Sequence, residues 1–394
     1  MIKSLKSFDL KDKRVLLRVD FNVPISKNKV VDDFRIVSSL PTIKHCLKSG
    51  AKIIIMSHLG RPGGKVVPEM SLISVGELLA DLLEMPIKFS DDCVSEDSHD
   101  VTLGLRSGEI HLLENLRFHP EEQNNEKEFS SKLAKHGEIY INDAFGTAHR
   151  SHASNNGVTK YFLNKGMGLL FEKELEYLTK KLIKPNKPLT VVLGGAKIDT
   201  KLDLINHFIT FADNILIGGG MAFTFLKARG IEIGNSLVDS TMIKEAKNIL
   251  TKARGKINLL FPTDAICAKN PENTKSAKVY NINDIPSNKC GLDIGPNTIE
   301  QFSEIISRSG TIFWNGPMGV FEIEGFHQGT ESLANLIGDA TDNDITTIVG
   351  GGDSVAAINQ FSSLDKFSHV SSGGGASLEL LTGNPLPSIY VLEL

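Results

Sequence analysis

The chain of 394 residues is too long for one compact core and suits two domains. With 41% hydrophobic and 23% charged residues it has the composition of an ordinary soluble globular protein, and its formal net charge of −4 argues against general binding to nucleic acid or to anionic membranes. No apolar run is long enough to span a bilayer, and the N-terminal residues lack the apolar segment of a signal peptide, so we expect a cytoplasmic location.

Short β-branched runs alternate with amphipathic runs through the first half of the chain. These runs predict strands over residues 14–19, 51–57, 109–113 and 139–142. Helices are predicted over residues 71–83 and 128–135 and after the Asp32-Asp33 pair, where one apolar stripe contains Ile36, Leu40, Ile43 and Leu47. Nearly continuous apolar strands separated by helices indicate a parallel sheet that is covered on both faces.

The pattern pauses near residues 160–190 and then resumes. A helical stripe contains Phe171, Leu175, Leu178 and Leu182, and prolines at 185 and 188 end it, which indicates a connecting helix and a hinge. A second series follows, with strands predicted over 189–193, 214–217, 258–261, 311–314 and 345–349 and helices over 201–208, 222–229 and 354–361. We therefore expect an α/β protein with two doubly wound, parallel-sheet (Rossmann-like) lobes joined by a hinge helix.

Cationic side chains follow the predicted strands of the first half. They belong to the segments Arg-Val-Asp-Phe-Asn (18–22), His-Leu-Gly-Arg-Pro (58–62), Leu-Arg-Phe-His (116–119) and Ala-His-Arg-Ser-His (148–152). Because the carboxyl ends of parallel strands meet at one edge of a sheet, we expect these segments to bring together Arg35, His58, Arg61, Arg117 and Arg150. The planar fork of arginine matches phosphate and carboxylate groups, so the sequence predicts an anion site, in which Asp20 and Asn22 could accept a sugar-like hydroxyl.

The cysteines give no sign of a disulfide framework or a metal centre. Cys46, Cys93, Cys267 and Cys290 are scattered, without short pairing or metal-ligand spacing, and we interpret them as small buried hydrophobes in a reducing compartment. The histidines of the basic segments have no carboxylate or cysteine at a suitable spacing, which argues against a zinc site; capping or core roles stay open for them.

The second half has glycine-rich turns instead of cationic segments. Three of them follow predicted strands, at Gly194-Gly195-Ala196-Lys197, Gly218-Gly219-Gly220 and Gly350-Gly351-Gly352-Asp353, and a fourth lies at 373–376. Glycine lets the backbone approach a ligand closely, and a helix N-terminus offers free N–H groups to a phosphate. Asp353 is a candidate magnesium ligand, because a hard cation that bridges phosphates takes one or two carboxylates; helix capping is the alternative role.

Familiar signatures of other classes are absent from the sequence. No stretch fits the Gly-x-x-x-x-Gly-Lys-Ser/Thr phosphate loop, and no Gly-x-Gly-x-x-Gly follows a strand, which argues against a nicotinamide-dependent dehydrogenase. No Gly-x-Ser-x-Gly nucleophile is present either. An acceptor that is already an ionised carboxylate needs no general base, so two anions on two lobes point to phosphoryl transfer, with a non-catalytic module that binds phosphorylated sugars as a further alternative.

Taken together, these motifs resemble those of the phosphoglycerate kinase family, in order and along essentially the whole chain. The matching segments are 18–24, 58–62, 113–119, 143–154, 194–201, 218–225, 292–296, 314–322, 350–354 and 373–381. The resemblance implies reversible phosphoryl transfer between 1,3-bisphosphoglycerate and ADP, giving 3-phosphoglycerate and ATP, with Mg²⁺ as the cofactor. It also implies a lobe for 3-phosphoglycerate over 1–170, a connecting helix and hinge over 171–187, a nucleotide lobe over 188–381, and a tail, 382–394, that packs back on the first lobe.

Site residues carry over from the family by position. The acid-binding set implied by the resemblance is Asp20, Phe21, Asn22, Arg35, His58, Leu59, Gly60, Arg61, Arg117 and Arg150. The nucleotide-binding set is Gly194, Gly195, Lys201, Gly218, Gly291, Asn315, Glu322, Gly350, Gly351, Gly352, Asp353 and Ser354, with Asp353 as the metal ligand. Charge on the transferred group would be balanced by Arg35, Lys197, Lys201, Gly373 and Gly374. A monomer without nucleic-acid or membrane partners is expected.

The sequence departs from the family pattern at three positions. Ser354 stands where threonine is common and keeps the hydroxyl, and Phe34 precedes Arg35 where a smaller polar residue is expected. Cys290 precedes Gly291 where a larger apolar side chain is usual, which affects the expected contact with the nucleotide base.

Overall fold

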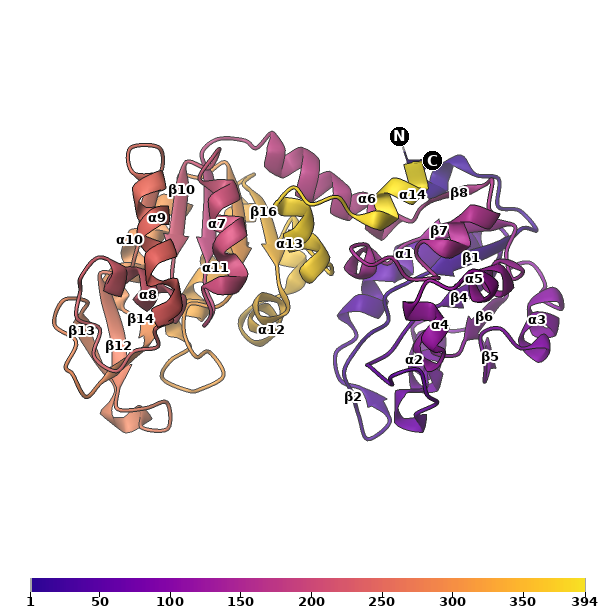
Figure 1. The fold of residues 1–394 in the computed structure, drawn as a ribbon, viewed down its shortest axis with the longest axis horizontal. Helices are drawn as coiled ribbons and strands as arrows, with labels where there is room; N and C mark the ends of the chain where they lie inside the picture. Colours follow the sequence, from indigo (N-terminus) through magenta and orange to yellow (C-terminus); the bar gives the residue numbers. More distant parts are fainter. Residues whose placement is uncertain (1, 394) are drawn as a thin grey trace. The chain divides into compact units, whose positions relative to one another are not determined.

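The structure is a computed structural model that describes residues 2–393, and the chain divides into two compact units (Figure 1). Residues 2–176 together with 383–393 form the first unit, and residues 177–382 form the second. Within residues 2–393, none of the helices combines the length and the apolar character that crossing a membrane requires.

The first unit is built on a parallel sheet of six strands in the order β5-β6-β4-β1-β7-β8. The strands are β1 (Arg14–Arg18), β4 (Lys52–Met56), β5 (Ile87–Ser90), β6 (Ile110–Leu113), β7 (Ile139–Asn142) and β8 (Lys165–Met167). The predicted parallel sheet is therefore confirmed, but the sequence analysis missed β5 and β8. Both are short edge strands, and β5 has no fully buried residue, so neither gives a continuous apolar run.

Alternate side chains of these strands point to opposite faces, and each face has its own apolar core. Val15 and Leu17 pack with residues of the helices α1 (Phe34–Lys48) and α2 (Ile73–Leu83), whereas Leu16 packs on the other face. That second face is covered in part by α5 (Lys127–Ala134) and by the C-terminal helix α14 (Pro387–Glu393). The remaining helices of the unit are α3 (Glu96–Leu103), α4 (Pro120–Gln123) and α6 (Leu169–Leu175).

The predicted cap of α1 and the predicted connecting helix are both present, each with a difference in detail. Asp32 accepts a hydrogen bond from Phe34 N at 3.0 Å and so caps α1, while the side chain of the adjacent Asp33 makes no capping bond. The predicted connecting helix is continuous in sequence but not regular, because α6 passes into a π-helical stretch, η6 (Glu176–Lys181). Phe171, Leu178 and Leu182 of its stripe are buried.

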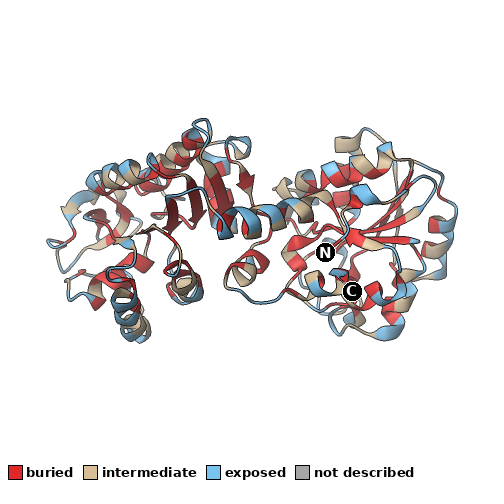
Figure 2. Ribbon diagram, turned by 90° about the horizontal axis from the view of Figure 1, so that it is seen from above, coloured by how far each residue is buried: buried red, intermediate tan, exposed pale blue. Residues whose placement is uncertain are grey.

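The second unit contains another parallel sheet of six strands, in the order β11-β10-β9-β15-β16-β17. These strands are β9 (Leu189–Leu193), β10 (Asn214–Ile217), β11 (Asn258–Leu260), β15 (Thr311–Asn315), β16 (Thr346–Gly350) and β17 (His369–Val370). The helices are α7 (Leu202–Phe208), α8 (Met221–Ala228), α9 (Ile243–Ala253), α10 (Pro296–Ile306), α11 (Gln328–Thr341), α12 (Gly352–Phe361) and α13 (Gly375–Leu381). In both units the central strands of the parallel sheet are buried and the outer turns of the helices are exposed (Figure 2).

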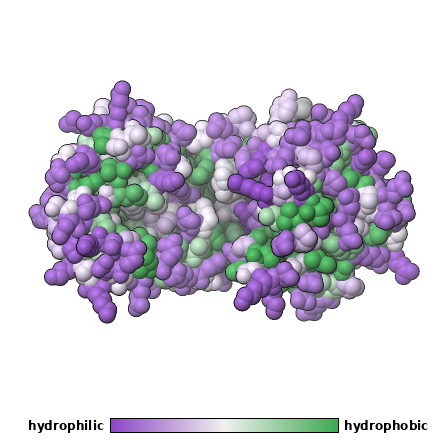
Figure 3. All heavy atoms as spheres, turned by 60° about the horizontal axis from the view of Figure 1, so that its bottom comes forward, coloured by the Kyte–Doolittle hydropathy of each residue, from purple (hydrophilic) through white to green (hydrophobic). Residues whose placement is uncertain are grey.

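The second unit also has an antiparallel sheet that the sequence analysis did not predict. Its order is β13-β12-β14, with strands β12 (Asp264–Ala268), β13 (Lys278–Asn281) and β14 (Cys290–Ile294). β13 has no buried residue and Asp293 interrupts β14, so hydropathy alone does not reveal these two strands, whereas β12 is a short, fully buried run. A hairpin of β2 (Ile25–Ser26) and β3 (Lys29–Val30) was missed for the same reason. On the face in Figure 3, hydrophilic residues cover most of the surface and apolar residues form smaller groups.

Candidate functional site

The cationic residues of the first unit lie where its central strands end. Arg18 is the last residue of β1, His58 follows β4, and Arg117 lies in the short helix η3 (Leu116–Phe118), which follows β6. Arg150 comes after β7. Because β6, β4, β1 and β7 are neighbours in a parallel sheet, their carboxyl ends form one edge, where open α/β sheets bind ligands.

Asp20 and Asn22 organise one side of this edge. Arg35 Nη1 lies 3.1 Å from Asp20 Oδ2 and donates a hydrogen bond to Asn22 O at 3.0 Å. The amide oxygen of Asn22 accepts a hydrogen bond from Gly60 N at 2.9 Å, and Gly60 O accepts one from Arg117 Nη1 at 2.7 Å. The predicted residues Asp20, Asn22, Arg35, Gly60 and Arg117 therefore form one connected network.

Four predicted residues lie outside this network. The side chains of Phe21 and Leu59 are buried in the apolar core, so only their backbone groups could reach a ligand. Arg61 is exposed and takes part in none of these contacts within residues 2–393. Arg150 is half-buried and its Nε donates to His149 Nε2 at 3.2 Å.

Two buried charges that the sequence analysis left out complete the arrangement. Arg18 is 1% exposed; its Nη2 lies 3.3 Å from His58 Nδ1 and its Nε donates to Ser154 Oγ at 2.8 Å. Ser154 in turn donates from Oγ to Glu122 Oε1 at 2.6 Å, and Glu122 is fully buried. A charge inside a continuous apolar run, as in Arg-Val-Leu-Leu-Arg (14–18), is the sequence signal that could have identified Arg18.

The titration of the nearby groups shows a surplus of positive charge. Burial first, and then the charges of Arg18, Arg117 and Arg35, lower the pKa of His58 well below its ordinary value. Burial, followed by the charges of Arg18, Arg117 and Arg150, lowers the pKa of His152 to about 4. Burial, with the charges of Arg18 and Arg150, lowers the pKa of Arg117 to about 10. A bound anion would offset the part of each shift that comes from the neighbouring positive charges, so the edge is suited to bind a small acid.

In the second unit, glycine turns pack tightly against one another. A Cβ on Gly219 would lie 2.6 Å from Gly195 N, and a Cβ on Gly194 would lie 2.1 Å from Pro317 O. Gly195 and Gly219 also have positive φ angles of 100° and 65°, which favour glycine. The close contacts explain why these strand-to-helix turns need glycine in addition to any ligand that they hold.

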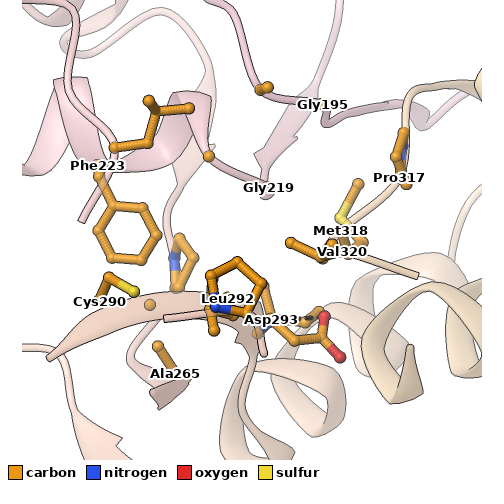
Figure 4. A pocket seen from close by; sticks show the side chains of 18 of the residues that line it. Gly195, Gly219, Phe223, Ala265, Cys290, Leu292, Asp293, Pro317, Met318 and Val320 are labelled. Atoms are coloured by element: carbon orange, nitrogen blue, oxygen red, sulfur yellow. Dashed lines mark hydrogen bonds between the residues drawn. The ribbon is translucent and has the colours of Figure 1, made fainter. Parts of the chain in front are cut away.

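A pocket of about 520 Å³ lies beside these turns. Figure 4 shows Phe223, Leu292 and Met318 around it, near the turns at Gly195 and Gly219. The Phe223 ring covers Gly291, because a Cβ there would lie 2.1 Å from Phe223 Cζ. An apolar pocket with glycine at its rim is suited to a flat aromatic base. Of the predicted residues, those that line it are Gly195, Gly291, Glu322 and Asp353.

Cys290 also lines this pocket, at the position where a larger apolar side chain was expected. It is half-buried, and burial raises the pKa of its thiol. The sequence analysis missed Phe223, which lies on α8 and supplies an aromatic wall. The run Met-Ala-Phe-Thr-Phe directly after Gly218-Gly219-Gly220 could have pointed to it.

Polar groups gather behind the pocket around the end of β15. Lys201 Nζ donates to Asn315 Oδ1, and Asn315 Nδ2 donates to Gly350 O at 2.7 Å. Burial lowers the pKa of Lys201, and the charge of Asp353 opposes that shift. Ser354 Oγ accepts a hydrogen bond from Gly316 N at 2.7 Å, which ties the turn after β15 to the first turn of α12.

Asp353 lies in the first turn of α12 and is exposed. The N-cap of that helix is Gly351, and no side chain caps it, so the capping role considered for Asp353 is wrong. Lys197 is exposed, and Gly373 donates from its N to Ser371 Oγ at 3.1 Å just before α13. Lys197, Gly373 and Gly374 are outside the residues that line the pocket.

Comparison with known proteins gives the same result along the whole chain. The family model described as phosphoglycerate kinase matches residues 5–384. A phosphoglycerate kinase of Pelodictyon phaeoclathratiforme is 48% identical over 393 residues, covering 99% of both chains, and one of Thermosynechococcus vestitus is 46% identical over 394 residues, covering 100% of this chain and 98% of the other.

Solved structures agree with the sequence relatives. The phosphoglycerate kinase from Coxiella burnetii superposes with a TM-score of 0.89 at 39% identity, covering 100% of this chain and 99% of the other. The enzyme from Pyrococcus horikoshii OT3 superposes with a TM-score of 0.86 at 31% identity, covering 100% and 98%. The chain therefore belongs to the phosphoglycerate kinase family and is a phosphotransferase with a carboxyl group as acceptor.

Proposed function

We propose that the cationic edge of the first unit binds 3-phosphoglycerate or 1,3-bisphosphoglycerate and that the pocket of the second unit binds ADP or ATP. The observation that carries this division is the distribution of charge. Arg18, Arg35 and Arg117 surround His58 at one sheet edge, whereas the second pocket is lined mainly by glycine and apolar side chains. A small acid and a flat base need these two kinds of site.

Each predicted residue has a proposed role in binding. The glycerate is held by Asp20, Asn22, Arg35, His58, Arg61, Arg117 and Arg150, with backbone groups of Phe21, Leu59 and Gly60. Lys201 and the turns at Gly194-Gly195, Gly218 and Gly350–Ser354 hold the nucleotide phosphates, while Gly291, Asn315 and Glu322 contribute to the rest of that site. Arg61 is exposed and hence available to a ligand that arrives from solvent.

The proposed chemistry needs no general base. An oxygen of the 3-phosphoglycerate carboxylate forms a bond to the γ-phosphorus of ATP while the bond from that phosphorus to ADP breaks, and the reverse step regenerates ATP. Arg35, Lys197, Lys201 and the backbone at Gly373-Gly374 neutralise charge on the transferred group. Fixed donors aimed at developing charge are the main source of rate enhancement in such reactions.

Asp353 fits a magnesium ion that accompanies the nucleotide. Its carboxylate is exposed, lines the pocket and makes no hydrogen bond or ion pair within residues 2–393. Mg²⁺ prefers one or two carboxylates and phosphate oxygens, and when bound it would neutralise phosphate charge.

We propose that residues 171–187 act as the hinge between an acid-binding lobe, 1–170, and a nucleotide-binding lobe, 188–381, with the tail 382–394 belonging to the first. Bending at the hinge would bring the two ligands together. The helical irregularity at Glu176–Lys181 supports this location, because π-helical turns occur frequently at functional sites. A cytoplasmic, monomeric enzyme is proposed from the family resemblance.

A crossed binding experiment tests the division of labour. Calorimetry would measure the affinity for 3-phosphoglycerate and for Mg-ATP in Arg117→Ala and in Lys201→Ala. The first change is expected to weaken only the acid, and the second only the nucleotide. Loss of both affinities from either change would contradict two separate sites, and absence of turnover in an assay with 3-phosphoglycerate and Mg-ATP would contradict the function.

A further inference from the structure

Asp92, Cys93 and His119, none of them assigned to the anion site, come together on the first unit. Asp92 and Cys93 follow β5, and His119 precedes α4, so distant segments supply the three side chains. One ligand atom from each residue, a carboxylate oxygen, Sγ and an imidazole nitrogen, lies within 4.8 Å of the other two. Nothing in the proposed phosphoryl transfer uses this cluster.

The three groups have the chemistry of a transition-metal site. Zinc is bound in proteins by thiolate, imidazole and carboxylate, and in a tetrahedral site such atoms are about 3.5 Å apart. His119 Nε2 lies 2.9 Å from Asp92 Oδ2, and Asp92 Oδ1 accepts hydrogen bonds from Val94 N at 2.6 Å and Ser95 N at 2.8 Å. The backbone bonds orient the Asp92 carboxylate as an outer shell of contacts would.

An open acidic pocket gives access to the cluster. The pocket, of about 420 Å³, is lined by His119 and by Glu121, Glu126 and Glu128, with Lys132 the one lysine or arginine among the residues that line it. Glu121 Oε2 is buried and has no hydrogen-bond partner within residues 2–393. This carboxylate oxygen belongs to a residue that lines the same pocket as His119, and it could supply a further ligand to a cation.

We propose that Asp92, Cys93 and His119 form a binding site for a borderline-soft divalent cation of the zinc or cobalt class. The cation would replace the hydrogen bond between His119 and Asp92 and draw Cys93 Sγ inward. The proton of the thiol is released to solvent when the metal–sulfur bond forms. Mg²⁺ is not a candidate, because it prefers an octahedral set of oxygen ligands.

The same residues form a simpler arrangement when no metal is bound, and metal binding must replace it. Without a metal, Asp92 and His119 form an ion pair, and Cys93 is 1% exposed within the apolar core. Burial raises the pKa of the Cys93 thiol well above its ordinary value in this arrangement. The two arrangements differ in one measurable respect, which is whether a metal–sulfur bond forms.

Cobalt titration of the chelator-treated, full-length protein distinguishes the two arrangements. One equivalent of Co²⁺ is added without nucleotide, and the near-ultraviolet charge-transfer band of a cobalt–thiolate bond is recorded. The band is expected in the unmodified protein and in Cys46→Ser, which changes another free, buried cysteine outside the cluster. It should be lost in Cys93→Ser, and His119→Gln should weaken Co²⁺ binding at least tenfold.

Absence of the band in the unmodified protein, or its persistence in Cys93→Ser, would overturn the proposal. If circular dichroism shows that Cys93→Ser does not fold, His119→Gln decides the matter, since its side chain is partly exposed and unchanged Co²⁺ affinity would also overturn the proposal. A rise in the melting temperature with Zn²⁺ in the unmodified protein, absent from His119→Gln, would support it by mass action.

Discussion

Arg18 and His58 lie side by side at the ends of paired parallel strands, with 3.3 Å between Arg18 Nη2 and His58 Nδ1. Since burial and the neighbouring arginines hold the pKa of His58 far below its ordinary value, His58 is neutral near pH 7. Its Nδ1 then accepts a hydrogen bond from Arg18, and Nε2 carries the proton. His58 therefore adds no positive charge to the anion site near neutral pH, and Arg18, Arg35 and Arg117 supply positive charge around it.

Arg35→Ala is expected to lower kcat by about a hundredfold or more, because one donor to the transferred charge is worth about 3–4 kcal/mol of barrier. The affinity for Mg-ATP should stay nearly unchanged. Steady-state kinetics and calorimetry would measure the two effects, with Arg106→Ala as the control for an exposed arginine outside the site. Unchanged turnover would remove Arg35 from the mechanism.

Arg18→Met should lower the free energy of unfolding by about 3 kcal/mol, because it leaves the buried Glu122 carboxylate without its compensating charge. The double variant Arg18→Met/Glu122→Gln should recover part of this loss. Urea unfolding of the four proteins forms a double-mutant cycle. Strictly additive losses would mean that the two side chains are not coupled through Ser154.

Lys201→Ala should raise the dissociation constant of ATP at least tenfold, equivalent to about 1.4 kcal/mol, while 3-phosphoglycerate affinity is unchanged. The physical reason is the loss of a half-buried cation beside Asn315 and Asp353. Lys227→Ala, an exchange on α8 outside the pocket, provides the control. Equal nucleotide affinity by calorimetry would refute the role of Lys201.

The stability of the protein should fall as pH rises from about 5 to about 8 through the titration of Asp143. Burial raises the pKa of Asp143 to about 7, so the folded state binds more protons than the unfolded state in this interval. Asp143→Asn keeps an oxygen for the hydrogen bonds from Leu170 N at 3.0 Å and Phe171 N at 3.2 Å. Relative to the unmodified protein, this variant should gain about 2 kcal/mol between pH 5 and pH 8.

Unfolding by urea at several pH values would measure that gain. Ser130→Ala, at another buried polar position of the first unit, is a control for substitution without a titrating group. A difference between Asp143→Asn and the unmodified protein that does not change with pH would show that Asp143 is ionised throughout.

The parallel sheets could be predicted from the sequence because their central strands are continuous apolar runs. Few other secondary structures fit such short runs. The strand over 139–142, for example, has the bounds of β7, and the strand over 189–193 has those of β9. Edge and antiparallel strands such as β13 carry exposed polar residues, and their identity depends on partners that lie elsewhere in the chain. Local hydropathy does not identify such partners.

The candidate site shows the same limit at the level of single residues. Asp20 and Arg117 could be predicted because they lie in recognisable sequence motifs, and Arg35 because it carries over from the family by position. The structure joins the three residues in one network. Glu122 could not, since its importance comes from burial beside Ser154 and Arg18, residues far away in the sequence. The spacing of Asp92, Cys93 and His119 along the chain does not indicate that their side chains lie close together.

The helix α14 lies against β8 and contributes Leu392 to the core of the first unit. The second unit is thus an insertion within the first, which is completed by residues 383–393. During synthesis on the ribosome, residues 383–393 emerge only after the whole inserted unit. Until then the first unit cannot complete its fold, because part of its core stays uncovered. The unit synthesised second is the one that can finish folding first.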